Sequence, residues 1–125
     1  MKLLDTSVAI DHLRGSAPAI DLLSSSIEAE EPLLASEVVR FELLAGAREK
    51  EVEALERFFS AISWVPVGEE VSRTAGSLAQ RHRRAHSGIG DADYLIAATA
   101  LLLDAELLTT NVRHFPMIAG LEPAY

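Results

Sequence analysis

The chain contains 125 residues, of which 49% are hydrophobic and 24% charged, and this balance predicts a single globular domain over residues 1–125 with a real buried core. Its 11 basic and 19 acidic residues give a net charge of -8, which argues against an unaided, sequence-independent nucleic-acid binder. There is no cysteine, so disulfides, thiolate metal sites and cysteine nucleophiles are excluded.

The apolar runs of the chain are short. Asp5 interrupts the first of them before the apolar core of a signal peptide can form. The longest, residues 94–103, is too short to span a bilayer. We therefore expect a cytoplasmic protein without a membrane partner.

Short apolar runs alternate with segments of helical periodicity along the chain. In chain order, the sequence predicts a strand at 2–6, helices at 7–13 and 19–27, a strand at 33–35, helices at 36–45 and 48–62, a strand at 63–67, helices at 69–86 and 91–103, and a strand at 106–110. Ser36 is expected to be the N-cap of its helix, and the tail is expected to be a loop with at most one more short strand. Pro66 places the third strand at a sheet edge, because proline cannot donate a ladder hydrogen bond. This alternation predicts a three-layer α/β/α domain around a central parallel sheet of four to five strands.

The segment 88–100 combines two glycines and two aspartates with the start of an almost wholly apolar helix. Asp91 follows Gly90 where a helix cap is expected, and a carboxylate there is favoured by the free N–H groups of the first turn. Asp93 lies two residues further on and is less suited to capping. Because charge at the entrance to a buried helix needs a partner or a metal, we expect Asp93 to serve a site.

Other polar residues follow the predicted strands. In a parallel α/β sheet the ligand site lies beyond the carboxyl ends of the strands, which is where Asp5, Thr6 and Asn111 fall. Glu42 interrupts an apolar helix and cannot pair with Arg40, since residues two apart on a helix do not face each other. The structural alternatives are a turn or helix cap for Asp5 and a turn for Asn111.

Three or four oxygen ligands drawn from separate segments suit Mg²⁺ or Mn²⁺ rather than zinc. The four histidines lack zinc-ligand spacing, and we expect them at the surface: His12, His82, His86 and His114. The sequence therefore predicts a hard-cation site, with Mg²⁺ as the first choice and Mn²⁺ as the alternative.

The basic residues form one cluster, at 81–86, which contains Arg81, Arg83 and Arg84. Cations in the last turn of a helix complement the helix dipole, and this is the default interpretation. In so acidic a chain, these arginines and Arg113 are also candidates to contact a phosphate backbone.

Three motifs, in this order, resemble the PIN domain, and more closely the VapC toxins of type II toxin–antitoxin modules. They are Leu4-Asp5-Thr6-Ser7, the segment 36–46 that carries Glu42, and the segment 93–100 that begins with Asp93. Each motif alone is weak, but together they are specific, and the resemblance covers nearly the whole chain.

The resemblance implies a metal-dependent endoribonuclease that cleaves structured RNA, namely tRNA or ribosomal RNA. It places the catalytic acids at Asp5, Glu42 and Asp93, with Asp5 and Asp93 as metal ligands and Glu42 acting directly or through water. It also implies a homodimer and a cognate VapB-type antitoxin that blocks the acid pocket with basic residues.

The chain departs from the family pattern at Asn111, where a fourth acid is common. One missing charge argues against a fully occupied two-metal site. Thr6, Asp91 and Asn111 are then expected in auxiliary roles, with Asp91 as a substitute source of negative charge. The alternative is a domain that binds RNA or a protein partner through its acid pocket without cleaving.

Overall fold

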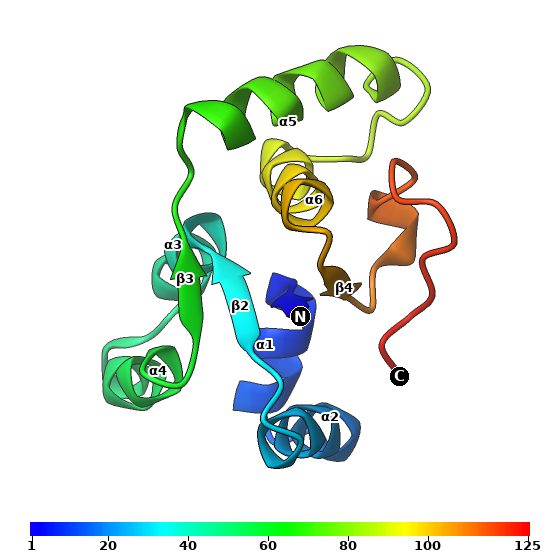
Figure 1. Cartoon of the computed structure of the whole chain (residues 1–125). Helices are drawn as coiled ribbons and strands as arrows, with labels where there is room; N and C mark the ends of the chain where they lie inside the picture. The colour runs from blue at the N-terminus through cyan, green and yellow to red at the C-terminus, as the bar shows by residue number, and fades with distance from the viewer.

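The computed structural model describes all 125 residues and shows helices on both faces of a four-stranded parallel sheet (Figure 1). The strands are β1 (Lys2–Leu4), β2 (Leu33–Ser36), β3 (Ser63–Val65) and β4 (Glu106–Leu108). The helices are α1 (Thr6–Leu13), α2 (Ala17–Glu28), α3 (Glu37–Ala45), α4 (Val52–Phe59), α5 (Glu69–His82) and α6 (Asp91–Leu103), with short 3-10 turns η1 (Glu49–Glu51) and η2 (Val112–His114). The predicted three-layer α/β/α fold is confirmed.

The connections between strands decide where the helices lie. The sheet order is β3-β2-β1-β4, so the first two crossovers move one way across the sheet and the third returns past β1. Because parallel crossovers are right-handed, α1 to α4 cover one face, and α5 with α6 cover the other. Figure 1 shows α5 and α6 together at the top, and α1 and α2 at the bottom. The topological switch point therefore lies between β1 and β4, where a ligand site is expected.

The most buried helix is α6. Its inward residues are Tyr94, Ile96, Ala97, Ala98, Thr99 and Ala100. The Thr99 hydroxyl donates a hydrogen bond of 2.8 Å to the carbonyl of Leu95, so this buried polar group is satisfied within the helix. Burial on most sides explains why the sequence shows an apolar run here rather than an amphipathic stripe.

Two predictions about these elements hold, whereas β1, β3 and β4 each end two residues earlier than predicted. Ser36 caps α3, since its hydroxyl accepts the N–H of Val38 at 3.2 Å, and β3 lies at the sheet edge. Helix α5 ends at His82 rather than at 86, because the exposed residues 83–88 offer no apolar face to pack. The tail forms no strand, although the N–H of Ala124 donates to the carbonyl of Thr109 at 2.8 Å.

Arg40 of α3 packs against aromatic rings of α4 and of the edge strand β3. Its guanidinium forms a two-pronged ion pair with Glu37, at 2.7 and 2.8 Å. The same group lies 4.2 Å from the ring centre of Trp64 and 5.2 Å from that of Phe59. A planar cation held by both a carboxylate and two aromatic rings sets the position of α3, which carries Glu42.

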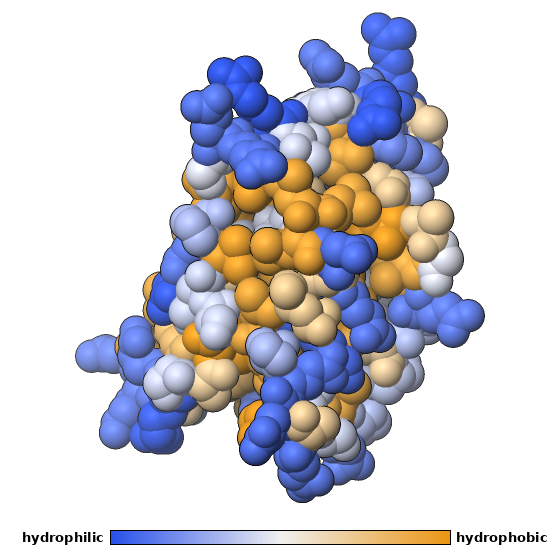
Figure 2. All heavy atoms as spheres, in the orientation of Figure 1, coloured by the Kyte–Doolittle hydropathy of each residue, from blue (hydrophilic) through white to orange (hydrophobic).

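None of the helices combines the length and apolar character that crossing a lipid bilayer requires. In Figure 2, apolar atoms gather in the middle of the face in view, and hydrophilic side chains project above α5 at the top. The exposed apolar side chains include Val67 and, near the end of α6, Leu101 and Leu102.

Gly76 offers a test of helix propensity within this fold. It is an exposed position inside α5, and an added Cβ meets no atom within 4 Å. Because glycine in a helix interior costs about 0.5–1 kcal/mol relative to alanine, Gly76→Ala is expected to raise the free energy of unfolding by that amount in urea denaturation. Gly120 has a φ of +71°, so Gly120→Ala is expected to lower it. An unchanged midpoint for Gly76→Ala would contradict the prediction.

Candidate active site

Hydroxyl groups from two distant segments hold Asp5 at the carboxyl end of β1. Its Oδ2 accepts hydrogen bonds from the hydroxyls of Ser7, at 2.9 Å, and Thr109, at 2.7 Å. The Asp5 N–H donates to the carbonyl of Leu108 at 2.9 Å, which continues the pairing of β1 with β4. Asp5 is only 4% exposed, and its Oδ1 accepts no hydrogen bond from the protein. One oxygen is therefore anchored while the other remains available to a ligand.

The same two hydroxyls also organise the turn that follows β4. Thr109 Oγ1 accepts the N–H of Asn111 at 2.9 Å, and Ser7 Oγ accepts the N–H of Thr110 at 3.2 Å. Each hydroxyl thus donates to the buried carboxylate and accepts from the turn. The sequence analysis assigned no site role to Ser7 or Thr109, although two threonines at a strand end were an available signal.

Asp93 lies in the first turn of α6 with 19% of its side chain exposed. Its Oδ2 accepts the N–H of Gly90 at 3.2 Å and lies 3.3 Å from Nδ1 of His114. Burial raises the pKa of Asp93, and the nearby charge of Asp5 raises it further, whereas the Gly90 N–H and His114 act in the opposite direction. Asp5 and Asp93 both contact the segment that follows β4, Asp5 through Thr109 and Asp93 through His114, so the two carboxylates flank the same end of the sheet.

The capping roles at the start of α6 differ from the prediction. Gly90 is the N-cap residue, and Asp93 supplies the carboxylate that accepts its N–H, so the assignment of Asp91 as the cap was wrong. Asp91 is exposed and accepts a hydrogen bond of 2.6 Å from the guanidinium of Arg83. Residues two apart on a helix point about 200° apart, which directs Asp91 toward the end of α5 and Asp93 toward Asp5.

Glu42 reaches the site through Thr6. The Thr6 hydroxyl donates a hydrogen bond of 2.6 Å to Oε1 of Glu42. Glu42 is thus linked by one hydrogen bond to Thr6, the residue that follows Asp5 in the chain.

Asp5 itself precedes α1 in the N-cap position, but its side chain makes no capping hydrogen bond. The alternative role of helix cap therefore does not describe this carboxylate.

The oxygen and nitrogen donors around Asp5 decide whether a divalent cation could bind there. No group of three or more His, Asp or Glu side chains is arranged to hold a metal. Glu42 is bound to Thr6, and Asn111 lies exposed. The structure therefore does not assemble ligands from three or four segments. Asp5 and Asp93 still fit Mg²⁺, which typically binds through one or two carboxylates and keeps several waters.

Two histidines have neighbours that the sequence did not reveal. His114 is exposed, as expected, yet its Nδ1 contacts Asp93, because buried Phe115 anchors η2 beside the site. His12 is half-buried rather than at the surface, and its ring lies 5.2 Å from that of Phe58. Burial lowers the pKa of His12.

The predicted basic residues differ in their contacts. Arg83 pairs with Asp91 and lies 5.6 Å from the ring centre of Tyr94. Arg81 makes a weak contact of 3.5 Å to the carbonyl of Ser77, Arg84 makes no ion pair, and Arg113 is exposed in η2, beside His114.

Comparison with known proteins identifies the fold and its relatives. Residues 2–121 match the profile of the PIN domain family. The chain is 59% identical to Ribonuclease VapC19 of Mycobacterium tuberculosis over 125 residues, with both chains fully covered. It is 42% identical to Ribonuclease VapC10 of the same organism, with coverage of 100% of this chain and 93% of the other.

Solved structures of toxin–antitoxin complexes share the fold. A complex from Klebsiella pneumoniae is 26% identical and superposes with a TM-score of 0.79, covering 100% of this chain and 98% of that one. VapBC2 from Rickettsia felis, bound to a promoter DNA fragment, is 23% identical and gives a TM-score of 0.82, with coverage of 96% and 94%.

The Thr109 hydroxyl is expected to contribute to stability through its two hydrogen bonds. Thr109→Val keeps the shape of the side chain but leaves Asp5 one donor short and the Asn111 N–H without an acceptor. The free energy of unfolding should fall by about 1–3 kcal/mol in urea denaturation. Thr110→Val is the control, since no hydrogen bond involves that hydroxyl. Equal losses in the two variants would contradict this assignment.

The raised pKa of Asp93 predicts a pH-dependent cost in metal-free protein. The native state binds more protons than the unfolded state between the ordinary pKa of 3.8 and the raised native value, so stability falls as pH rises through that window. In EDTA, the thermal stability of Asp93→Asn relative to wild type should therefore increase as the pH rises from 3.8 through the raised native pKa. Asp91→Asn, which loses the pair with Arg83, should show no such gain. Parallel pH profiles for wild type and Asp93→Asn would refute the prediction.

Proposed function

The chain belongs to the PIN domain family, with VapC ribonucleases among its relatives, and on this premise we propose that it is a metal-dependent endoribonuclease, the toxin of a type II toxin–antitoxin pair. The observation that carries the proposal is the buried carboxylate of Asp5. Its Oδ1 is free of protein donors and shares a pocket with Asp93 at the switch point of the sheet. Full-length similarity to a named ribonuclease supports the same activity.

Asp5 and Asp93 are the residues that would hold Mg²⁺, or Mn²⁺ in its place. Such a cation, when bound, lowers the pKa of a coordinated water and offsets the charge that develops on the phosphate oxygens. Burial raises the pKa of Asp93, and the negative charge of Asp5 adds to this effect, so the two carboxylates repel each other. Their mutual repulsion favours a cation between them.

The surrounding residues keep these carboxylates in place. Ser7 and Thr109 hold Oδ2 of Asp5, so the rotamer is set before any ligand arrives. The N–H of Gly90 and the ring of His114 hold Asp93. Catalysis gains from groups that are already oriented, because no reorganisation is then needed during the reaction.

Glu42, Thr6 and Asn111 complete the proposed site from its periphery. The hydrogen bond from Thr6 keeps Glu42 where it can act on the site directly or through a water molecule. Asn111 contributes its N–H to Thr109, and its exposed amide side chain is available to orient a water or the substrate. Asp91 is paired with Arg83 in the first turn of α6, so it supplies neither a metal ligand nor unpaired negative charge.

We also propose a VapB-type antitoxin and a structured RNA, tRNA or ribosomal RNA, as partners. The antitoxin is supported by the solved relatives, which are toxin–antitoxin complexes, and by a net charge of -8 that suits a basic segment. The homodimer implied by the resemblance and the cytoplasmic location expected from the short apolar runs stay predictions.

Incubation of the antitoxin-free protein with total RNA tests the activity. Discrete products are expected with Mg²⁺ or Mn²⁺ and not in EDTA. Asp93→Asn should lose these products while its circular dichroism spectrum stays that of the folded protein. Asp104→Asn is a matched control, since it removes the same charge at the far end of α6, in a left-handed conformation that asparagine accepts.

The outcome separates the two candidate functions. Cleavage that persists in Asp93→Asn, or that proceeds in EDTA, would rule out the metal site at Asp5 and Asp93. Binding of RNA or antitoxin without metal-dependent products in any condition would favour the non-catalytic alternative.

A further inference from the structure

Most cations of this acidic chain are already paired. Six of its 11 lysines and arginines have a carboxylate within 4.0 Å: Lys2, Arg40, Arg48, Arg57, Arg73 and Arg83. The remaining five are Arg14, Lys50, Arg81, Arg84 and Arg113. Arg81 and Arg84 are the only two of these that lie within one helical turn of each other in the sequence, at the end of α5. A guanidinium left free among 19 acids is available to an anion from outside.

The helix dipole accounts for only part of this group. Arg81 lies in the last turn of α5, and its Nε contacts the carbonyl of Ser77 at 3.5 Å, as expected for a cation near a helix end. Arg83 is the C-cap residue and is committed to Asp91. Arg84 lies beyond the cap and makes no hydrogen bond or ion pair, so the structure of the chain itself gives it no partner.

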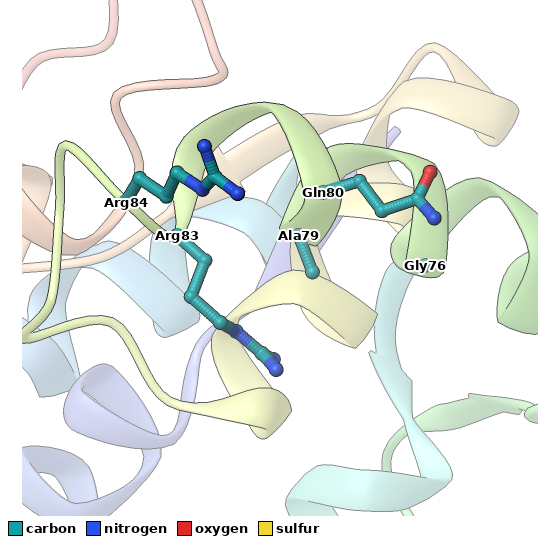
Figure 3. A pocket seen from close by; sticks show the side chains of 5 residues that line it. All are labelled: Gly76, Ala79, Gln80, Arg83 and Arg84. Carbon is teal, nitrogen blue, oxygen red and sulfur yellow. The ribbon is translucent and has the colours of Figure 1, made fainter.

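Arg84 lines a surface hollow of about 420 Å³ together with Gly76, Ala79, Gln80 and Arg83. Gly76 and Ala79 leave space because their side chains are small, and the amide of Gln80 adds a hydrogen-bond donor. In Figure 3 the Arg84 side chain runs back along the last turn of α5, whereas Arg83 extends toward the ribbon of α6. Two guanidinium groups and one amide line the hollow, and Ala79 is its only hydrophobic residue.

The hollow is connected to the start of α6 through Arg83. Arg83 spans from the hollow to Asp91 in the first helical turn, and Asp93 in the same turn faces Asp5. By neutralising Asp91, Arg83 lowers the repulsion that a polyanion meets on its way over this helix end.

We propose that Arg84, with Gln80 beside it, forms a phosphate-binding subsite for the RNA strand that enters the acid pocket. This inference rests on the proposed ribonuclease function and assigns the substrate contact to one arginine of the cluster. Arg83 is a positioning residue, which holds Asp91 and the start of α6. RNA is favoured over a protein partner because Arg84 is a guanidinium without a carboxylate partner in the chain, and Arg83 beside it already binds the helix turn that carries Asp93.

The test measures how RNA binding depends on salt. The Asp93→Asn chain, which leaves RNA intact, is titrated with a fluorescein-labelled oligouridylate of about twelve nucleotides, at constant MgCl₂. Adding Arg84→Ala should reduce the slope of log Kd against log salt by about 0.7, the value for one phosphate contact on a single strand. The affinity difference from the parent should then shrink roughly 2–3-fold between about 50 and 200 mM salt.

Two further variants make the result specific. Arg73→Ala removes the same charge from the same helix, where Arg73 is paired with Glu69 at 2.8 Å, and should leave the slope unchanged. Arg84→Lys keeps the charge and should keep most of the slope. Circular dichroism should show the same helical content in every variant, because both arginines are exposed.

Each outcome has a distinct meaning. Equal slopes for Arg84→Ala and Arg73→Ala, with RNA bound by the parent, would overturn the subsite and leave the ribonuclease proposal standing. A loss confined to Arg83→Ala would assign the contact to Arg83 and contradict the division drawn above. Absence of RNA binding in the parent, together with absence of cleavage by wild type, would overturn the proposed function itself.

Discussion

The fold depends on the need to stabilise one buried carboxylate. Asp5 is almost fully buried, and a charge in that position is costly unless donors surround it. Ser7 lies in α1, the helix that follows β1. Thr109 lies in the turn directly after β4, 104 residues from Asp5 along the chain. Both hydroxyls also accept N–H groups from the turn after β4. The same hydrogen-bond network therefore stabilises the charge of Asp5 and holds the turn after β4 against the start of α1, at the switch point of the sheet.

The start of α6 organises the surface on both sides of this centre. Asp93 points into the acid pocket and also accepts the Gly90 N–H, so the same carboxylate ends the loop and faces Asp5. Asp91 points outward and is held by Arg83 from α5. The two acids differ because helical geometry separates residues two apart by more than half a turn.

Sequence patterns were most reliable for features that depend on local chemistry. Period and composition predicted the order of strands and helices, Pro66 indicated the edge strand, and Ser36 the cap of α3. Helix α5 was predicted to end at residue 86 but ends at His82, since basic and polar residues can extend a helical pattern without an apolar face to stabilise it. The sequence predicted Asp91 as the cap of α6, whereas Gly90 is the N-cap and Asp93 accepts its N–H. This difference was missed because Asp91 and Asp93 are both acceptable in a first helical turn.

The sequence by itself determined the α/β alternation, the family and the identity of the acids, because periodicity and motif are local properties of the chain. Only the tertiary structure decided which groups meet. Thr109 with Asp5, Thr6 with Glu42, and Arg83 with Asp91 are all contacts between separate elements. Such pairs are set by the strand order and by which way each side chain points, and neither quantity is written in spacing along the chain.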